Sequence, residues 1–249
     1  MSKERYYINT QGNDDEAYRE AMHFALELTK KGMDAKTVIL LARTKQNVGW
    51  LERLFDRQTV KKLFRGLRFE NSEPLFLIKT VKTYTEYSAS NDIVIGMGLD
   101  SDDLMKLDDY YDVKAIISIP WLNESIQSWV KTWSPTDLRT KEKPTAFSMP
   151  EPIVQMAMKE LTSNINMSTG IRNSFDNDRA KTYIRALHKY SVLDGEIVMA
   201  YLVRELGWDS DNATDVKKLI DTLNNGKYFK GGDKTYLKNH IKSWEEDVK

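Results

Sequence analysis

The first half of this sequence alternates short apolar runs with segments of helical spacing. The run Val38-Ile-Leu-Leu-Ala42 is apolar throughout, as expected of a strand that is buried on both faces of a parallel sheet. Similar β-branched or aromatic runs recur, and helix-like segments separate most of them. The five runs expected to form strands lie at residues 5–9, 37–42, 75–79, 92–97 and 113–119. This alternation predicts an α/β fold with an open, mainly parallel, five-stranded Rossmann-like sheet.

Local signals support the helices between these strands. Asn13 is followed three positions later by Glu16, a capping-box pattern that predicts the start of the first helix. Pro120 is expected to open a helix that buries Leu122, Ile126, Trp129, Val130 and Trp133. The link between the third and fourth strands is polar and tyrosine-rich, and it carries no clear helical pattern.

A change of composition after the fifth strand predicts a second structural part. Residues 136–152 contain prolines and a Lys-Glu-Lys run with little periodicity, so we interpret them as a linker. The predicted domains are therefore a sheet domain at 1–135 and a mostly helical module at 153–249. Helices are expected near residues 152–163, 178–190, 195–206, 212–224 and 233–247. Trp208 and Trp244 are expected to anchor the core of this module.

Composition excludes several classes of protein. The 249 residues are 41% apolar and 30% charged, which is typical of a globular protein. Lys plus Arg equals Asp plus Glu, so any contact with nucleic acid requires a local basic patch. Thiolate chemistry is excluded because there is no cysteine. No apolar stretch is long enough to span a membrane, and no signal region follows the start, so we expect a cytoplasmic location without membrane partners.

The strand pattern also predicts where a ligand would bind. In open α/β sheets ligands bind beyond the carboxyl ends of the strands, where the strand order reverses. Loops expected at this edge run into helix N-termini, which favour anions such as phosphate. Arg43 follows the second strand and could clamp a phosphate. The predicted ligand-binding residues are Thr10, Gln11, Gly12, Asn13, Arg43, Gly96, Gly98 and Ser101. Gly12 and Gly98 could equally be ordinary turn residues, and Asn13 and Ser101 ordinary helix caps.

Aspartates on the loops after the first and fourth predicted strands suggest a second kind of site. Asp14, Asp100 and Asp102 could supply oxygen ligands to Mg²⁺, which would then be the cofactor. Asp100-Ser101-Asp102 resembles the Asp-x-Asp element of the Toprim nucleases and primases. The first element of that family is Glu-Gly, whereas Gln11-Gly12 stands here, and an amide cannot replace the carboxylate. Aspartates also favour first helical turns for electrostatic reasons alone.

Other patterns leave the function open. The spacing of His23, His188 and His240 does not fit a metal site. The sequence has neither the Gly-x-Ser-x-Gly elbow of a serine nucleophile nor the Walker A motif of a phosphate-binding loop. We therefore name no general base. Two sets of basic residues fall at helical spacing in the second half, with aromatic residues among the later set. They are Lys181, Arg185 and Lys189, and then Lys230, Lys234, Lys238 and Lys242. Such faces either bind phosphate backbones or are simply solvated.

Three functions follow from these observations. The leading hypothesis is a protein that binds a nucleotide-like or phosphorylated small ligand at the carboxyl edge of the sheet. The second is a metal-dependent phosphoesterase or nuclease-like enzyme that uses the Asp-rich loops. The third is an adaptor that binds nucleic acid or protein through the basic helical module.

Overall fold

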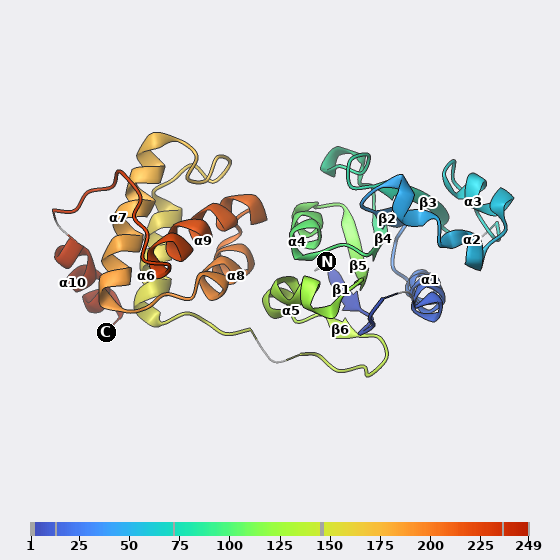
Figure 1. Cartoon of the computed structure of the whole chain (residues 1–249), viewed down its shortest axis with the longest axis horizontal. Helices are drawn as coiled ribbons and strands as arrows, with labels where there is room; N and C mark the ends of the chain where they lie inside the picture. The colour runs from blue at the N-terminus through green and yellow to red at the C-terminus, as the bar shows by residue number, and fades with distance from the viewer. Residues whose placement is uncertain (1–2, 13, 72, 145–146, 236, 249) are drawn as a thin grey trace. The chain divides into compact units, whose positions relative to one another are not determined.

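A computed structural model describes residues 3–12, 14–71, 73–144, 147–235 and 237–248. The chain divides into two compact units, which we call the sheet unit (residues 1–146) and the helical unit (residues 147–249). Figure 1 traces both units along the chain.

The sheet unit is built on a parallel sheet, which confirms the predicted α/β architecture. Its strands are β1 (Glu4–Tyr7), β2 (Thr37–Ala42), β3 (Leu75–Thr80), β4 (Asp92–Met97), β5 (Val113–Ile119) and β6 (Thr136–Asp137). Their order across the sheet is β3-β2-β4-β5-β1-β6. The sheet therefore has six strands, and the prediction of five was wrong.

The additional strand comes from the segment that the sequence indicates to be a linker. In β6, Thr136 and Asp137 pair with Tyr6 and Tyr7 of β1, and the Leu138 amide donates to the Tyr7 carbonyl at 2.8 Å. Two residues are too few to produce an alternating or apolar pattern, so the sequence gives no signal for this strand.

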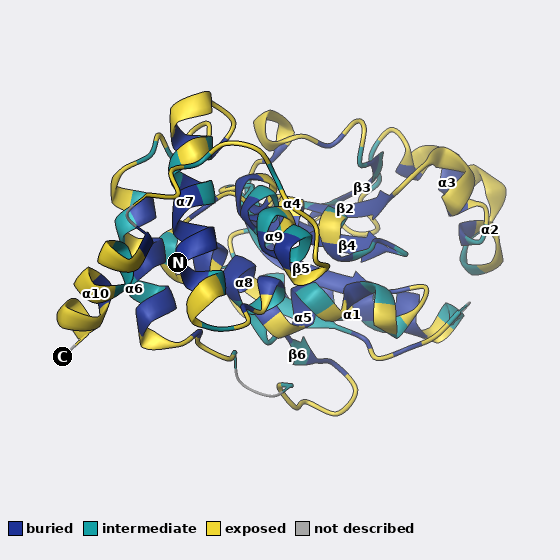
Figure 2. Ribbon diagram, turned by 60° about the vertical axis from the view of Figure 1, so that its left-hand side comes forward, coloured by how far each residue is buried: buried dark blue, intermediate teal, exposed yellow. Residues whose placement is uncertain are grey.

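Burial along each strand matches its place in the sheet. Every residue of β4 is buried, and β2 is buried from Val38 to Ala42, because both strands lie inside the sheet with helices on each face. The edge strand β3 alternates between buried and half-buried residues. Figure 2 shows this burial along the strands and the exposed outer surface of the helices.

Helices cover both faces of the sheet. They are α1 (Asp15–Lys30), α2 (Leu51–Leu54), α3 (Arg57–Leu63), α4 (Ser101–Asp109) and α5 (Gln127–Trp133), with the short 3-10 helices η1 (Lys45–Val48), η2 (Glu86–Ser88) and η3 (Asn123–Ile126). On one face α1, α2 and α3 pack against a core that includes Leu40, Ile95 and Ile117. On the other face α4 contacts α5 and β5 (Figure 1).

The helical unit contains α6 (Pro152–Ser163), α7 (Ser174–Tyr190), α8 (Gly195–Leu206), α9 (Ser210–Asn224) and α10 (Leu237–Val248). Glu160 of α6 joins three helices, because its two carboxylate oxygens accept hydrogen bonds from the Tyr183 hydroxyl of α7 and the Trp244 indole of α10. Trp208 donates to the Thr162 hydroxyl at 2.9 Å. Both tryptophans are buried, which confirms the prediction that they anchor this core.

Among the helices in the described part of the chain, none is long and apolar enough to cross a membrane.

Candidate functional site

The strand order reverses between β2 and β4. These strands are neighbours in the sheet, yet the chain leaves β2 towards β3 on one side and leaves β4 towards β5 on the other. Connections that diverge in this way leave a crevice beyond the carboxyl ends of the two strands. A ligand site is therefore expected above Ala42 and Met97, the last residues of β2 and β4.

A cleft of about 440 Å³ lies at this position, which we call the carboxyl-edge cleft. Its volume falls within the range of about 300–1,000 Å³ that is usual for small-ligand sites. It is lined by Tyr18, Arg43, Gln46, Asn47, Trp50, Met97, Gly98, Asp100, Trp121, Leu122 and Ser125. These residues follow three strands that are adjacent in the sheet, β2, β4 and β5, and one comes from α1.

The segment after β2 is held in shape by a local capping box. The Asn47 side-chain oxygen accepts hydrogen bonds from the Thr44 amide at 3.2 Å and from the Thr44 hydroxyl at 2.6 Å. The Trp50 indole donates to the Asn47 carbonyl at 2.7 Å. These bonds fix the turn that carries the side chains of Gln46, Asn47 and Trp50 into the lining, so this part of the cleft is formed before any ligand binds.

Aromatic side chains give the cleft much of its character. The rings of Tyr18 and Trp50 stack with centroids 3.5 Å apart. Burial raises the pKa of the Tyr18 hydroxyl to about 12, so this residue stays neutral at physiological pH. Trp121, by contrast, is 54% exposed, and Leu122 beside it is also exposed. Large exposed apolar side chains beside a cleft are typical of ligand or partner sites.

One guanidinium and two carboxylates define the charge of the cleft. Arg43 donates from Nη2 to Asp100 and from Nε to Asp103 at 2.9 Å. Hydrogen bonds to Asp100 and then Asp103 raise the pKa of Arg43. Burial would raise the pKa of Asp100, but the Arg43 hydrogen bond and backbone amides lower it overall. The three charged groups therefore carry one positive and two negative charges, and the guanidinium is already partnered.

The loops that contain Gly12 and Gly98 are hydrogen-bonded to the segment after β5 and to the last residue of β5, respectively. The Gly12 amide donates to the Trp121 carbonyl at 2.7 Å, and the Gly98 amide donates to the Ile119 carbonyl at 2.8 Å. Both glycines have positive φ, a conformation that other residues rarely adopt. The loops after β1 and β4 thus meet at the same edge, as predicted, although these two amides are not available to a ligand.

The remaining residues of the predicted ligand site have mostly structural contacts. The Thr10 hydroxyl donates to Asp14 at 2.7 Å, and the Ser101 hydroxyl accepts from the Trp129 amide at 3.3 Å. Gly96 leaves room for Leu99 and Leu104 on the α4 side of the sheet. Gln11 is exposed, and Asn13 lies outside the described residues. Of the predicted set, Arg43 and Gly98 line the carboxyl-edge cleft.

Aspartate side chains cap the N-termini of α1 and α4, the helices that follow β1 and β4. Asp14 accepts from the Ala17 amide at 3.0 Å, and Asp100 accepts from the Asp103 amide at 3.1 Å. A hydrogen bond from Thr10, together with the contacts of Ala17 and Arg139, lowers the pKa of Asp14 to about 2. Because these carboxylates occupy the positions where a phosphate would bind, the helix N-termini provide little attraction for an anion.

The aspartates that were predicted as metal ligands have separate partners. Asp14 pairs with Arg139 at 2.8 Å, Asp100 pairs with Arg43, and Asp102 lies in the first turn of α4. Within the described part of the chain, no group of three His, Asp or Glu side chains is arranged to hold a metal ion. Magnesium binding at this edge therefore remains a prediction from the sequence.

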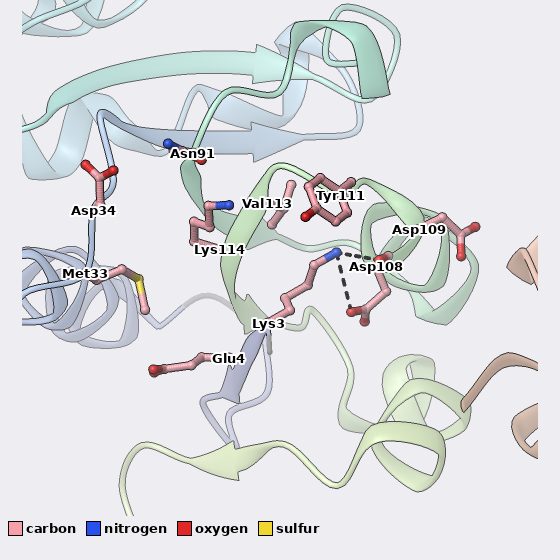
Figure 3. Close-up of a pocket in the computed structure, with 10 residues that line it drawn as sticks. All are labelled: Lys3, Glu4, Met33, Asp34, Asn91, Asp108, Asp109, Tyr111, Val113 and Lys114. Carbon is pink, nitrogen blue, oxygen red and sulfur yellow. Dashed lines mark hydrogen bonds and ion pairs between the residues drawn. The ribbon is translucent and has the colours of Figure 1, made fainter. Parts of the chain in front are cut away.

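A second cavity, of about 510 Å³, lies at the opposite edge of the sheet, beside the amino ends of β1, β4 and β5 (Figure 3). Figure 3 shows Lys3 pointing towards Asp108. The Lys3 ammonium donates to the Asp108 carbonyl and to the Tyr110 carbonyl at 2.8 Å, and so caps the C-terminal end of α4. Burial lowers the pKa of Lys3 to about 8 despite the attraction of Asp108. These contacts hold Lys3, just before β1, against the C-terminal end of α4.

Several residues of the carboxyl-edge cleft were missed by the sequence analysis. They are Tyr18, Gln46, Asn47, Trp50, Met97, Trp121, Leu122 and Ser125. Trp121 and Leu122 follow a strand that was predicted, but Leu122 was expected to be buried in a helix that opens at Pro120. This was wrong, because Leu122 is 46% exposed and the helical segment begins at Asn123. Trp50 carries no signal for the cleft, because its spacing equally fits a helix that packs on the sheet.

Comparison with known proteins adds one finding. Residues 150–245 match the model of a family described as a domain of unknown function (DUF1889). That match covers most of the helical unit and none of the residues that line the carboxyl-edge cleft. Neither the curated proteins nor the solved structures gave a match to the chain.

Proposed function

We propose that the sheet unit binds a nucleotide-like small molecule in the carboxyl-edge cleft. The observation that carries this proposal is the composition of the lining, which includes Trp50 and Trp121 together with the amide side chains of Gln46 and Asn47. Aromatic rings stack on the flat face of a nucleobase, and amides form hydrogen bonds with its polar edge. The position at the reversal of strand order supports the same conclusion.

The charged groups of the cleft indicate which part of the ligand contributes most. Arg43 is the cation that could reach a phosphate, but it is held by Asp100 and Asp103. A phosphate must therefore displace a carboxylate or bring a cation of its own. The base and sugar are expected to supply most of the binding energy, and the phosphate a smaller part.

Thermal unfolding of the full chain with nucleosides and with their mono-, di- and triphosphates, each with and without Mg²⁺, tests the proposal. A ligand at about 100 times its Kd stabilises the folded state by about 2.7 kcal/mol and raises Tm. We expect at least one base to raise Tm, and Trp121→Ala to remove that shift. Trp121 is exposed, so its replacement should leave the Tm of the free protein nearly unchanged.

The matched control is Tyr111→Ala, which removes an exposed aromatic ring at the amino edge of the sheet. This variant should retain the full ligand-induced shift. The proposal is wrong if no nucleoside or nucleotide raises Tm, or if Trp121→Ala and Tyr111→Ala respond to the ligand alike. A shift that requires Mg²⁺ as well as phosphate would favour the metal-dependent hypothesis.

A further inference from the structure

Two segments of the helical unit contain basic residues and no acidic ones. Residues 179–193 include Arg179, Lys181, Arg185 and Lys189 without any Asp or Glu. Residues 222–232 include two lysines and again no carboxylate side chain. The helical unit is otherwise rich in acidic residues, so its charge is unevenly distributed along the chain.

The structure places these two segments side by side. Arg185 of α7 donates from Nη2 to the Phe229 carbonyl at 2.5 Å and from Nη1 to the Gly231 carbonyl, and its guanidinium lies 4.4 Å from the centre of the Phe229 ring. Gly232 allows this approach, because a side chain there would collide with Arg185 and Lys181. Figure 1 shows the loop after α9 running along α7. The two basic segments therefore form one surface.

Within the described part of the chain, four lysines of this surface make no ion pair, although one carboxylate lies at its edge, where Asp178 accepts from the Gly232 amide at 3.0 Å. Arg185 is only 7% exposed, and its guanidinium donates to main-chain carbonyls. No ion pair joins Lys181, Lys189, Lys227 or Lys230 to any carboxylate among the residues that the structure describes. Arg179, at the start of the first segment, does pair with Asp176, as Arg172, Arg204, Lys217 and Lys218 pair with carboxylates elsewhere in the unit. The surface consequently attracts anions.

Exposed aromatic rings lie among these cations. Tyr228 is 91% exposed between Lys227 and Lys230, and Tyr190 is 49% exposed next to Lys189. The two aromatic segments are held near each other, since the Asn224 amide side chain donates to the Leu193 carbonyl at 2.6 Å. We call the set of Lys181, Lys189, Tyr190, Lys227, Tyr228 and Lys230 the basic aromatic surface.

We infer that the basic aromatic surface binds single-stranded nucleic acid. Lysines bind the phosphate backbone, and an exposed tyrosine offers a face on which an unpaired base stacks. A duplex hides the faces of its bases, so Tyr228 would contribute nothing to its binding. The aromatic residues thus select a single strand over the other polyanions that lysines alone would attract. This site is independent of the carboxyl-edge cleft.

Fluorescence anisotropy of a labelled oligodeoxythymidine of about 15 nucleotides, close to the upper site size of single-strand binding folds, tests the inference on the full chain. We expect binding to weaken as salt rises from about 50 to 200 mM. Each phosphate contact with a single strand contributes about 0.7 to the slope of log K against log salt. The variant Lys227→Gln/Lys230→Gln removes two such contacts, so it should lower the magnitude of that slope by about 1.4. Tyr228→Ala should weaken binding about tenfold, within the range for one stacked base.

Two matched variants control for charge and aromaticity. Lys159→Gln/Lys218→Gln removes two exposed lysines of the same unit, and Phe175→Ala removes a ring that is 85% exposed at the start of α7. Both should bind like the unmodified protein. The inference is overturned if the oligonucleotide does not bind at about 50 mM salt, where electrostatic contacts are strong. It is also overturned if a duplex of equal length binds as tightly, if the controls weaken binding as much, or if vesicles with phosphatidylserine bind instead of the oligonucleotide.

Discussion

The ring of Tyr18 lies 3.5 Å from the ring of Trp50, centroid to centroid, with an angle of 23° between their planes. This stack joins α1 to the segment after β2 and forms part of the carboxyl-edge cleft. Aromatic stacking contributes about 0.5–1.5 kcal/mol beyond the burial of the rings. The contact therefore stabilises the fold and shapes the candidate site at the same time.

Replacing Trp50 tests both roles. Trp50→Ala should lower the free energy of unfolding by about 2 kcal/mol, because it loses the stack and part of the buried ring. Trp50→Phe keeps a stacking ring but loses the hydrogen bond to the Asn47 carbonyl, so its loss should be about 1 kcal/mol. Urea unfolding measures both values. Equal stability of Trp50→Ala and the unmodified protein would show that the stack does not hold this segment.

Acid should destabilise the sheet unit partly through Asp14. Its pKa is about 2 in the folded protein, against an ordinary value of 3.8, so the charged form is favoured by folding. The stabilisation is complete well above pH 3.8 and is lost as the pH falls through 2. Asp14→Asn keeps a side chain that caps helices equally well but cannot titrate. Unfolding followed between pH 5 and 2 should therefore show a weaker pH dependence for Asp14→Asn.

Removal of the cap itself gives a separate result. Asp14→Asn and Asp14→Ala both lose the charge-dependent stabilisation at neutral pH, and Asp14→Ala should cost about 1 kcal/mol more because it also loses the cap. The idea that Asp14 acts as a cap is wrong if the two variants are equally destabilised at neutral pH.

Arg43 should matter more for ligand binding than for folding. Its side chain is 48% exposed, and exposed ion pairs contribute about 0–1 kcal/mol. Arg43→Gln should thus unfold at nearly the same urea concentration as the unmodified protein. Calorimetric titration should show weaker binding of nucleotides and unchanged binding of the matching nucleosides. If both ligand classes lose affinity equally, Arg43 does not contact the phosphate.

Removing one partner from the pair of Arg5 and the buried Asp108 should strongly destabilise the protein. Arg5 Nε lies 2.7 Å from Asp108 Oδ1, and the same carboxylate accepts from the Trp129 indole. Burial raises the pKa of Asp108, while Arg5 and Lys3 oppose that shift. Arg5→Leu should cost about 3 kcal/mol, because it leaves a buried carboxylate with one partner fewer.

The double variant Arg5→Leu/Asp108→Leu separates loss of the pair from loss of packing. It should be more stable than Arg5→Leu alone, since the unpaired carboxylate is removed. Chemical denaturation of the two variants measures the difference. A double variant that is less stable than Arg5→Leu would show that Asp108 acts chiefly through Trp129.

The sequence predicted the sheet because its central strands are short apolar runs, and burial on both faces requires such runs. It also placed Arg43 and Gly98 at the carboxyl edge, where both line the cleft. That a ligand binds at this edge stays a prediction. Trp50 and Trp121 could not be assigned to one cleft, because their proximity depends on a strand order that joins distant segments. Asp14 and Asp100 were ambiguous for another reason. The same residue at the same position serves as a helix cap, a metal ligand or a partner of arginine.

The position of β1 affects how the protein is made. This strand is the first to be synthesised, yet it pairs with β5 on one side and β6 on the other. Ribosomes add about 5–20 residues per second, so the stretch of roughly a hundred residues before β5 takes on the order of ten seconds. During that time β1 has neither of its native neighbours, while β2, β3 and β4 can already pair with one another. During synthesis the sheet can therefore assemble from its β3 edge, and β1 can join it only after β5 has been made.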